Sequence, residues 1–550
     1  MQLLYTILIM LLVVSGTRIT AQFIPLPLPL LQIVIGALLA VPALGLHVRL
    51  EPELFLLLFI PPLLFVDGWR MPKGQFRELR TPILVLAFAL VFFTIVGAGY
   101  FIHWLLPQVP LAACFALAAV LSPTDAVAVS AITHGRLPRT LNNVLQGEAL
   151  MNDASGLVAF KFAVAATLTG VFSLMDASFQ FVLVAAGGVL VGVVLSYCFG
   201  RLRAWMIARG WEDPAPHVLM LLLLPFAAYV VAEHMGLSGI LSAVAAGMMQ
   251  SRLDLLPKQT TTRLLNRSVW TLLEFTFNGL IFLLLGLQLP DIVNAAFNGH
   301  QGEWSFVGWA LACVLSTYAV LMVLRFVWVY VYWRISGAMR RWRGKPTRFA
   351  GQSRIALSAV ITVGGVRGAV TLAGVMSLPL LLNNGQTFPE RDLLILIAAG
   401  VILLSLLVAS LVLPKILPLL PQDNAELRER ELNRHRSQIL ESAIRCLEAV
   451  EERASDANSA VATAEVKAKL MSEYRELLVR TQGASEAGEV GENSEKQYAV
   501  EELEHRLRLD ALRTQRKELY RMRKENLLDD DMLMEILRDL DIAEARLHKI

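Results

Sequence analysis

Long apolar segments follow one another through the first 420 residues of this chain and are separated by short, charged loops. The hydrocarbon core of a bilayer is about 30 Å thick, so a helix needs roughly 20 apolar residues to cross it. Backbone groups in lipid must be hydrogen-bonded within the protein, which makes such segments helices. A hydrophobic content of 55% and a mean hydropathy of +0.56 exclude an ordinary soluble domain. The sequence therefore predicts an all-α polytopic membrane protein.

Thirteen candidate spans can be placed along this part of the chain. They cover residues 3–17, 25–46, 52–68, 82–106, 110–132, 145–171, 179–200, 216–235, 237–250, 269–289, 305–333, 355–382 and 393–420. The segment at 3–17 lacks a basic region before it, so we expect a first transmembrane helix rather than a cleaved signal peptide. The short segment at 237–250 is expected to be buried among its neighbours or to merge with the span before it.

The charges of the loops predict the orientation. With these spans, 21 Lys and Arg residues fall in the loops on one side and two, Arg49 and Arg391, fall on the other. Basic loops remain in the cytoplasm. The sequence thus predicts a plasma-membrane protein with its N-terminus outside and its C-terminus in the cytoplasm.

Polar residues interrupt two of the spans at corresponding positions. If the seventh span is a linker, the others form two six-helix halves in inverted orientation, and the interrupted spans 110–132 and 355–382 occupy matching places. Interrupted segments at matching positions of inverted repeats indicate the midplane site of a secondary transporter. We expect the two broken helices to cross.

The break in span 110–132 contains Ser122, Pro123, Thr124 and Asp125. Proline removes a backbone donor, and the carbonyls that it leaves unbonded can bind a cation, together with the hydroxyl of Thr124. Inserting an ionised side chain at this depth of the membrane costs about 2.5–3.5 kcal/mol of free energy. Asp125 therefore indicates a functional site, or its negative charge compensates the positive N-termini of the half-helices. A simple proline kink with a capping Asp is the alternative.

Span 145–171 contains Glu148, Asn152 and Asp153. Helical spacing places Asn152 near the face of Glu148 and turns Asp153 by about 100°, toward a face with the small residues Ala149 and Gly156. Asp153 can therefore meet the break at Asp125. One carboxylate that holds either a proton or a cation is the minimal chemistry of antiport. The alternative is a structural, hydrogen-bonded Asp.

The break in span 355–382 surrounds Arg367 with Gly364, Gly365 and Gly368. Arginine does not deprotonate, so Arg367 is expected to form a structural ion pair and to compensate helix dipoles, with Glu148 as the first candidate partner and Glu274 as the second. A snorkelling arginine is the alternative. Lys161 and Arg325 are expected to be interfacial snorkellers.

Asp67, after Pro61 and Pro62, either reaches the cation site or caps a span. The remaining candidates are expected to be structural. The four cysteines lack metal or disulfide spacing and are expected to be inert. Histidines 103, 134, 217 and 234 fall near span ends and are expected to be solvated, although each could sense pH. We expect no cofactor and no nucleic-acid partner.

Four motifs resemble those of the monovalent cation:proton antiporters, the bacterial NhaP and animal NHE groups. GEALMND is similar to their GESLLND, and SPTDAVAV to their S/T-D-P/A-V-A-V segment. GGVRGAV resembles their G-x-R-G-A motif, and IPPLLFVDG resembles their PPLLFE or PPIILDAG segment. The resemblance implies thirteen transmembrane helices, a dimerisation domain, a mobile core domain, elevator-like alternating access and a homodimer.

The same resemblance assigns roles to residues. Asp153 would be the cation and proton carboxylate with Asn152 beside it, and Thr124 and Asp125 would come from the crossing helix. Asp153 and Thr124 would thus bind the transported metal cation. Glu148 and Arg367 would form the structural ion pair. In the family, an Asn-Asp pair accompanies electroneutral exchange, which Asn152 therefore implies.

Two positions depart from the family pattern. Ala149 replaces a serine, so Ser122, Thr124, Asp67 or water must complete the coordination. Aligning the prolines also places Val66 where the family has its acid, so Asp67 is one residue late. Both changes bear on selectivity among sodium, potassium and lithium.

The last 130 residues, 421–550, are charged and are predicted to be a cytoplasmic helical tail. Residues 424–479 and 495–550 show helical periodicity around a Gly/Ser/Glu linker at 481–493. The tail is acidic whereas residues 1–420 are basic. It is expected to form hairpins or coiled coils, or to dock on basic loops at 340–348, and to regulate transport.

The sequence thus predicts an electroneutral sodium/proton antiporter and leaves open whether lithium or potassium is carried at the same site. Potassium/proton exchange with the same fold is the main alternative. A gated cation channel would need a filter sequence, and none is visible. A membrane enzyme would need a nucleophile–base pair or a histidine-rich metal cluster in the spans, and none is visible.

Overall fold

The structure is a computed structural model that describes most of the membrane part and less of the tail. It describes residues 2–24, 26–40, 52–71, 73–170, 174–211, 213–253, 260–297, 304–342, 353–382, 385–420, 425–448 and 466–479, and the single positions 512, 514, 515, 521, 540 and 542. The chain divides into two compact units, Met1–Gln422 and Asp423–Ile550. The described residues of the first unit are helical apart from turns and one isolated bridge between Leu381 and Thr387. The predicted all-α class is confirmed.

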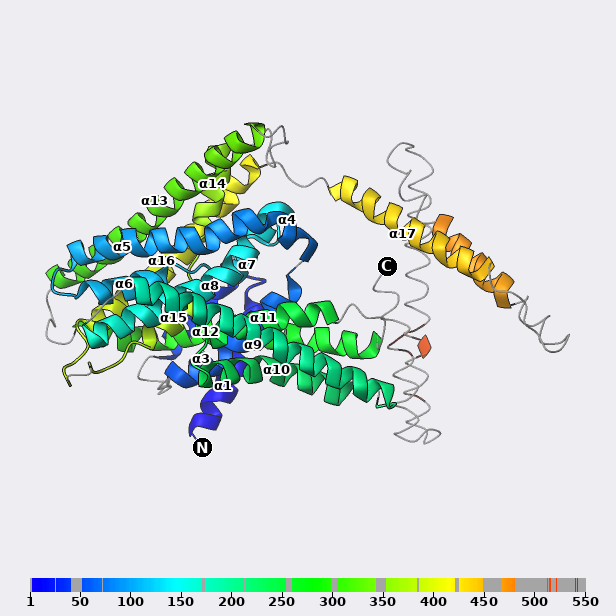
Figure 1. Ribbon diagram of the computed structural model, residues 1–550, viewed down its shortest axis with the longest axis horizontal. Coiled ribbons are helices and arrows are strands. Elements are labelled where there is room, and N and C mark those ends of the chain that lie inside the picture. The colour runs from blue at the N-terminus through cyan, green and yellow to red at the C-terminus, as the bar shows by residue number, and fades with distance from the viewer. Residues whose placement is uncertain are drawn as a thin grey trace. The chain divides into compact units, whose positions relative to one another are not determined.

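The helices of the first unit follow the predicted spans (Figure 1). The first eight are α1 (Gln2–Thr20), α2 (Leu28–Leu39), α3 (Pro52–Arg70), α4 (Lys73–Leu84), α5 (Leu90–Leu105), α6 (Leu111–Leu121), α7 (Ala126–Thr133) and α8 (Arg139–Thr169). A π-helical turn, Val85–Ala89, joins α4 to α5. The others are α9 (Leu174–Ala208), α10 (Pro214–His234), α11 (Gly239–Leu253), α12 (Thr260–Phe297), α13 (Trp304–Trp342), α14 (Arg354–Val363), α15 (Ala369–Met376) and α16 (Arg391–Ile416).

Seven of the described helices are long and apolar enough to cross a membrane, and the pair α6–α7, bent by 43°, can make an eighth span. Each of the thirteen predicted segments overlaps a helix or a broken pair. The count of thirteen crossings and the two inverted repeats stay predictions.

Several helices are longer than the apolar segments that predict them. The helices α12 and α13 have 38 and 39 residues, and α8 begins at Arg139 instead of residue 145. Hydropathy identifies only the part of a helix that lipid or the core can cover, and a polar end remains helical beyond it. This difference matters for the site, because the extended start of α8 holds the residues before Glu148 in helical register.

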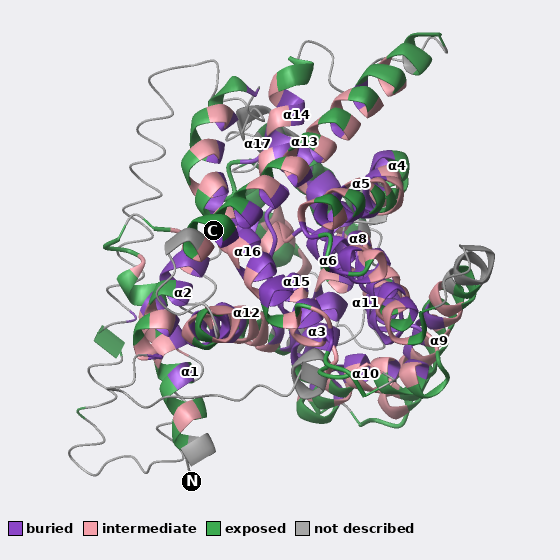
Figure 2. Cartoon of the chain, turned by 90° about the vertical axis from the view of Figure 1, so that its left-hand side faces the viewer, coloured by how far each residue is buried: buried purple, intermediate pink, exposed green. Residues whose placement is uncertain are grey.

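Burial is concentrated around the broken helices (Figure 2). More than half of the apolar window of α8 is buried, against 17% of that of α9. Glycines let several backbones approach closely: a Cβ at Gly36 of α2 would lie 2.2 Å from the Leu283 carbonyl oxygen of α12, and one at Gly247 of α11 would lie 2.2 Å from that of Phe65 in α3. Small residues at such contacts are typical of membrane helices. The predicted burial of residues 237–250 is confirmed, since Ala243, Val244 and Ala246 of α11 are buried.

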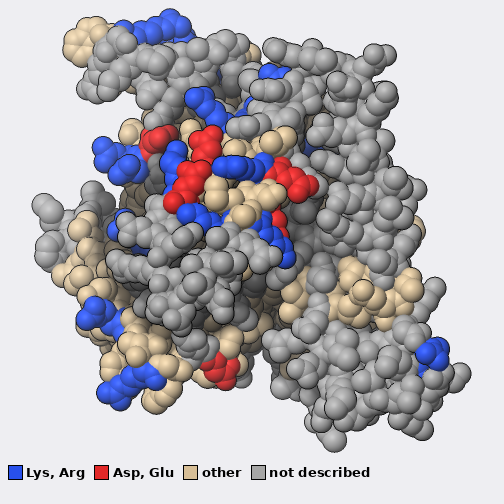
Figure 3. Space-filling model, turned by 90° about the vertical axis from the view of Figure 1, so that its right-hand side faces the viewer, with Lys and Arg blue, Asp and Glu red and all other residues tan. Residues whose placement is uncertain are grey.

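The described part of the second unit consists mainly of α17 (Ala425–Glu448) and a helix over residues 466–479. The Lys467 ammonium donates to the Glu448 carbonyl oxygen at 3.1 Å, and Arg475 lies 3.5 Å from the Glu448 carboxylate. These contacts place the two helices together, as a hairpin would. The linker at 481–493, nearly all of 495–550 and most of the basic loop at 340–348 lie outside the described residues. On the face shown in Figure 3, described acidic and basic side chains are intermixed rather than separated.

Candidate ion-binding site

The two broken helices cross at their breaks. The helix α6 ends at Leu121, and α7 begins after Asp125, whose carboxylate accepts from the backbone N–H groups of Val127 at 2.9 Å and Ala128 at 3.0 Å. The Asp125 backbone N–H donates to the Val366 carbonyl oxygen, in the break between α14 and α15, at 2.7 Å. The crossing is therefore held by a main-chain hydrogen bond, and Asp125 neutralises the positive N-terminus of α7.

Gly368 allows the two breaks to approach each other closely. A Cβ at Gly368 would lie 2.0 Å from one carboxylate oxygen of Asp125, which no side chain can accommodate without moving that group. Gly156 of α8 has the same role on the other side of the break, because its Cβ would lie 2.5 Å from Pro123. Gly156, one of the two small residues predicted to admit another backbone, thus admits the break itself.

The helix α8 carries Asn152 and Asp153 to the crossing. Asn152 is fully buried, and its amide donates to the Thr124 hydroxyl at 2.9 Å. One turn of α8 is anchored nearby, since the Ser155 hydroxyl donates at 2.7 Å to the Ala87 carbonyl oxygen in the π-helical turn. A π-helical turn leaves carbonyls without their usual helical donors. The Asp153 carboxylate makes no hydrogen bond or ion pair with any other residue that the structure describes, so it is available to a ligand.

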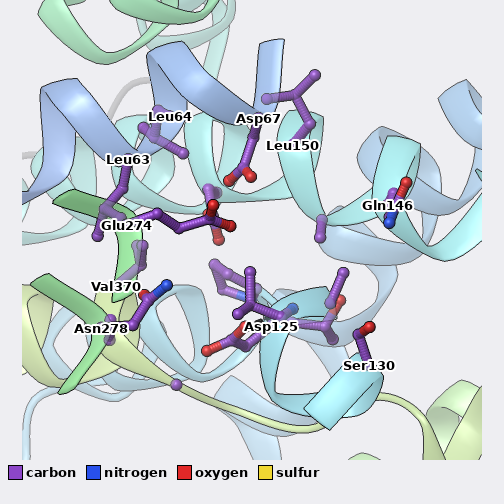
Figure 4. Close-up of a pocket in the computed structure, with 18 of the residues that line it drawn as sticks. Leu63, Leu64, Asp67, Asp125, Ser130, Gln146, Leu150, Glu274, Asn278 and Val370 are labelled. Atoms are coloured by element: carbon purple, nitrogen blue, oxygen red, sulfur yellow. Dashed lines mark hydrogen bonds between the residues drawn. The ribbon is translucent and has the colours of Figure 1, made fainter. Parts of the chain in front are cut away.

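A cavity of about 430 Å³ opens beside Asp153 (Figure 4). Its lining includes four carboxylates, those of Asp67, Asp125, Asp153 and Glu274. Polar neighbours in the lining are Arg70, Thr124, Ser130, Gln146, Asn278 and Thr371. Within the described residues, no three Asp, Glu, His or Cys side chains gather tightly enough for a multidentate metal site. The four acids thus surround a common space without forming one compact cluster.

Two predicted ligands do not line this cavity. The Ser122 hydroxyl is buried and donates to the Ala119 carbonyl oxygen, one turn back in α6, at 2.9 Å. Asn152 lies behind Thr124 and reaches the cavity through it. The structure therefore brings Asp153, Thr124, Asp125 and Asp67 to the space, with Asn152 positioning Thr124.

Asp67 resolves the register question left open by its motif. Val66 is buried in a cluster with Phe65, Leu221 and Trp270, whereas Asp67 lines the cavity from α3. Figure 4 shows the Asp67 and Glu274 side chains directed into the same space from α3 and α12. The acid that comes one residue late thus faces the site, and the position of the family acid packs on the opposite side.

The expected ion pair between Arg367 and Glu148 is wrong. Glu148 is fully buried and pairs with Arg325 of α13, whose guanidinium lies 2.5 Å from a Glu148 carboxylate oxygen. Arg325 also donates from Nε to the Ile361 carbonyl oxygen at 3.1 Å. The prediction of Arg325 as an interfacial snorkeller is therefore also wrong, because a buried carboxylate draws the nearest cation into the core.

Arg367 instead donates hydrogen bonds to backbone carbonyls at the helix breaks. Its Nε donates to the Leu121 carbonyl oxygen at 2.9 Å and another guanidinium nitrogen donates to that of Gly365. Its backbone N–H donates to the Ser405 hydroxyl at 3.0 Å. These bonds compensate the C-terminal dipoles of the half-helices α6 and α14, which is the dipole role expected of Arg367.

Glu274, the second expected partner of Arg367, pairs with Arg70 at the end of α3. Lys161 pairs with Glu233 of α10 at 2.9 Å rather than snorkelling alone. Sequence reasoning missed Arg70 and Arg325 as partners. For Arg325 a signal existed, because it lies in the middle of an apolar span and Glu148 needs a cation at similar depth.

Among the residues that the structure describes, no cysteine or histidine lines the cavity. Cys114 and Cys313 are buried thiols and Cys198 is an exposed one. His103 and His234 bond to backbone carbonyls near helix ends. His217, expected to be solvated, is fully buried, with Nε2 2.9 Å from the Trp211 carbonyl oxygen.

Comparisons with known proteins identify the family of this chain. Residues 7–418 match the family described as sodium/hydrogen exchanger, transmembrane. The whole chain is 44% identical to an uncharacterized Na+/H+ exchanger of Escherichia coli, covering 99% of that protein. It is also 38% identical to a sodium, potassium, lithium and rubidium/H+ antiporter of Bacillus pumilus, covering all of this chain and 79% of that protein.

The fold has a counterpart among solved structures. The sodium proton antiporter MjNhaP1 of Methanocaldococcus jannaschii superposes with a TM-score of 0.57 at 15% identity, covering 76% of this chain and 99% of that one. The chain therefore belongs to the sodium/hydrogen exchanger family, whose members are monovalent cation:proton antiporters and thus secondary transporters rather than enzymes.

Proposed function

We propose that this protein exchanges cytoplasmic Na+ for external protons, one for one, with Asp153 as the carboxylate that holds either ion. The observation that carries the proposal is the environment of Asp153. Its carboxylate lines a cavity and makes no hydrogen bond or ion pair with another described residue. A carboxylate in a low-dielectric site without a counter-charge must bind a cation or a proton. Binding of the two is then mutually exclusive, which is what exchange requires.

The ligand set supports a monovalent cation. Thr124 supplies a hydroxyl, Asp67 supplies a second carboxylate across the cavity, and the remaining positions suit water. Oxygen ligands of this kind match hard cations. Ser122 is not part of the proposed set, because its hydroxyl is bonded to its own helix.

Electroneutral exchange is supported by the neutral partner of Asp153. Asn152 holds the buried position beside it and donates to Thr124, so that position contributes geometry and no titratable charge. Asp125 also has a titratable carboxyl group, but two backbone N–H groups hold it at the start of α7. These two features leave Asp153 as the carboxylate of the crossing that exchanges its ligand.

An elevator movement is supported by the way in which the helices pack. The pairs α2–α12 and α3–α11 approach closely at glycines, whereas α8 packs on the break of α6–α7 through Gly156. The cavity lies between these groups, since α3 and α12 line one side and α7, α8 and α15 line the other. A homodimer, the N-terminus outside and the C-terminus inside belong to the same proposal, the orientation being supported by the basic loops.

Potassium/proton exchange at the same site is a second candidate. The relative of Bacillus pumilus is named for sodium, potassium, lithium and rubidium. The same cavity would serve, because oxygen ligands discriminate these cations only through distance and rigidity.

Purified protein in liposomes with an internal pH dye tests the proposal. A pH gradient is imposed, Na+, Li+ or K+ is added outside, and the membrane voltage is either left alone or clamped with potassium and valinomycin. Dye recovery on Na+ that ignores the clamp is the expected result. Recovery on K+ alone would replace Na+ by K+ as the substrate, and recovery that depends on the clamp would contradict electroneutrality. No recovery with any cation would contradict antiport.

A further inference from the structure

An ion pair between two helices stands at the edge of the cavity. Arg70, the last residue of α3, pairs with Glu274 of α12 and also donates to the Thr271 hydroxyl at 3.2 Å. The Arg70 side chain is 40% exposed and that of Glu274 19%, so the pair lies where the cavity meets solvent. Both residues line the cavity that contains Asp153. The four sequence motifs do not include Arg70. The sequence predicts Glu274 as a candidate partner of Arg367, not of Arg70.

The charges around the cavity are unbalanced. Among the residues that the structure describes, the lining contains four carboxylates and one basic side chain, that of Arg70. Asp67 lies one helical turn before Arg70 on α3 and lines the same cavity. Arg70 therefore has two acidic neighbours, Glu274 and Asp67, at the mouth of the cavity.

A structural brace is the simplest alternative role for this pair. Partly exposed ion pairs contribute little to stability, because water solvates both partners and salt screens them. The two helices that it would join, α3 and α12, already contact each other through apolar rings, Phe59 with Phe277 and Phe65 with Trp270, with ring centroids 5.3 Å apart in each pair. A brace would therefore add little, whereas both charges line the cavity that contains Asp153.

We propose that Glu274 attracts the entering cation at the mouth of the cavity and that Arg70 competes with this cation for the Glu274 carboxylate. The inference rests on the proposed function. The entering ion displaces the Arg70 guanidinium, is held briefly by Glu274 and Asp67, and passes to Asp153, after which Arg70 returns. Arg70 and Glu274 are thus positioning residues that set the apparent affinity for the cation, while Asp153 performs the exchange.

This role predicts opposite effects of two substitutions. Arg70→Gln releases Glu274 and should lower the KM for Na+, whereas Glu274→Gln leaves Arg70 facing Asp67 and should raise it. Each change of one charge near the site should move KM by about three- to tenfold, with the maximal rate nearly unchanged. Li+ and K+ should shift by the same factor, because the effect is one of charge rather than fit. Arg70→Lys keeps the positive charge, so its KM for Na+ should stay close to that of the wild type.

The measurement is Na+-dependent exchange in liposomes at alkaline pH, where few protons compete, together with binding of radioactive sodium to the purified protein. Lys161→Gln and Glu233→Gln are matched controls, because that ion pair is also partly exposed but does not line the Asp153 cavity. The controls should leave KM and binding unchanged. The thermal unfolding temperature of every variant reports on bracing.

Opposite shifts of KM, with matching shifts of the dissociation constant, support the inference. Shifts of KM in the same direction, or no shift beyond that of the controls, would overturn the inference. The Arg70–Glu274 pair would then be a structural brace between α3 and α12. The binding arm separates this inference from the proposed function. If the wild type binds sodium without exchanging it, antiport fails and the opposite shifts in binding still decide the role of Arg70. If the wild type neither binds nor exchanges cations, both are overturned.

Discussion

Glu148 and Asp153 are two carboxylates on one helix, five residues apart, and their surroundings give them different roles. Glu148 is fully buried and paired with Arg325 at 2.5 Å. Asp153 turns about 140° away and faces the cavity, with no ion pair to another described residue. A buried acid that is paired fixes structure, and an acid facing a polar space binds a ligand. The chemistry of an intramembrane acid therefore follows from its partner, not from its depth.

The largest effect on transport is expected from Asp153→Asn. The amide has nearly the shape of the acid but neither titrates nor carries charge, so cation-dependent dye recovery in liposomes should disappear. The variant should remain monodisperse and unfold at the wild-type temperature, because Asp153 has no structural partner among the described residues. Exchange at a wild-type rate would transfer the role to Asp67 or Asp125.

The largest effect on stability is expected from Glu148→Gln. It leaves the buried Arg325 without its counter-charge, which destabilises a protein by about 3–5 kcal/mol. Thermal unfolding in detergent should begin at a clearly lower temperature. Combining Glu148→Leu with Arg325→Met should recover most of the loss, because apolar side chains replace a buried pair well. A stable Glu148→Gln variant without exchange would show that both acids of α8 act in transport.

Gly368→Ala tests whether transport needs the close crossing of the two broken helices. Its Cβ would lie 2.0 Å from an Asp125 carboxylate oxygen, so the α7 cap must shift. Displacing a binding group by about an ångström lowers rates on the order of tenfold to a hundredfold. Gly308→Ala in α13, which has nothing within 4 Å of its new Cβ, is the matched control and should exchange normally. Equal initial rates for the two variants would show that the crossing tolerates movement.

A smaller effect is expected from Thr124→Val. The change keeps the shape but removes the acceptor of the Asn152 amide, and an unsatisfied buried donor costs about 1–3 kcal/mol. The KM for Na+ should rise while the maximal rate changes less, since the lost hydroxyl is a ligand rather than the exchanging group. Thr133→Val in α7 is the matched control, because its hydroxyl bonds only within its own helix. An unchanged KM would remove Thr124 from the ligand set.

The smallest effect is expected from Lys161→Gln. Its pair with Glu233 is partly exposed, and such pairs contribute under about 1 kcal/mol. Unfolding temperature and exchange should stay near wild type. A loss comparable to that of Glu148→Gln would contradict the distinction between paired acids in the core and paired acids near its surface.

Much of the site could be predicted because its residues are close in sequence or break helices. Pro123 and Gly368 interrupt spans by their own backbone chemistry, so the breaks are visible in the sequence. Asn152 and Asp153 are adjacent, so one helix places both. Their meeting with Thr124 required the two spans to cross, which the matching positions of the breaks indicated.

The ion pairs could not be predicted in the same way. Arg325 and Glu148 are 177 residues apart, and the sequence does not specify which faces of α8 and α13 meet. The sequence shows Arg367 and Glu148 as central charges and therefore predicts that they pair. The backbone carbonyls that bind Arg367 become available only where the helices break, and no sequence pattern displays them. Asp67 illustrates a register effect, since a shift of one residue along a helix changes the face by about 100°.

Proton release on sodium binding is the measurement that tests the central claim most directly. Purified wild-type protein in a weakly buffered solution near neutral pH is titrated with NaCl, while a pH indicator reports protons and radioactive sodium reports binding. The account predicts that protons are released in proportion to sodium bound, and that Asp153→Asn abolishes the release. Proton release that persists in Asp153→Asn, or sodium binding without release in the wild type, would contradict a single carboxylate that holds one ion or the other.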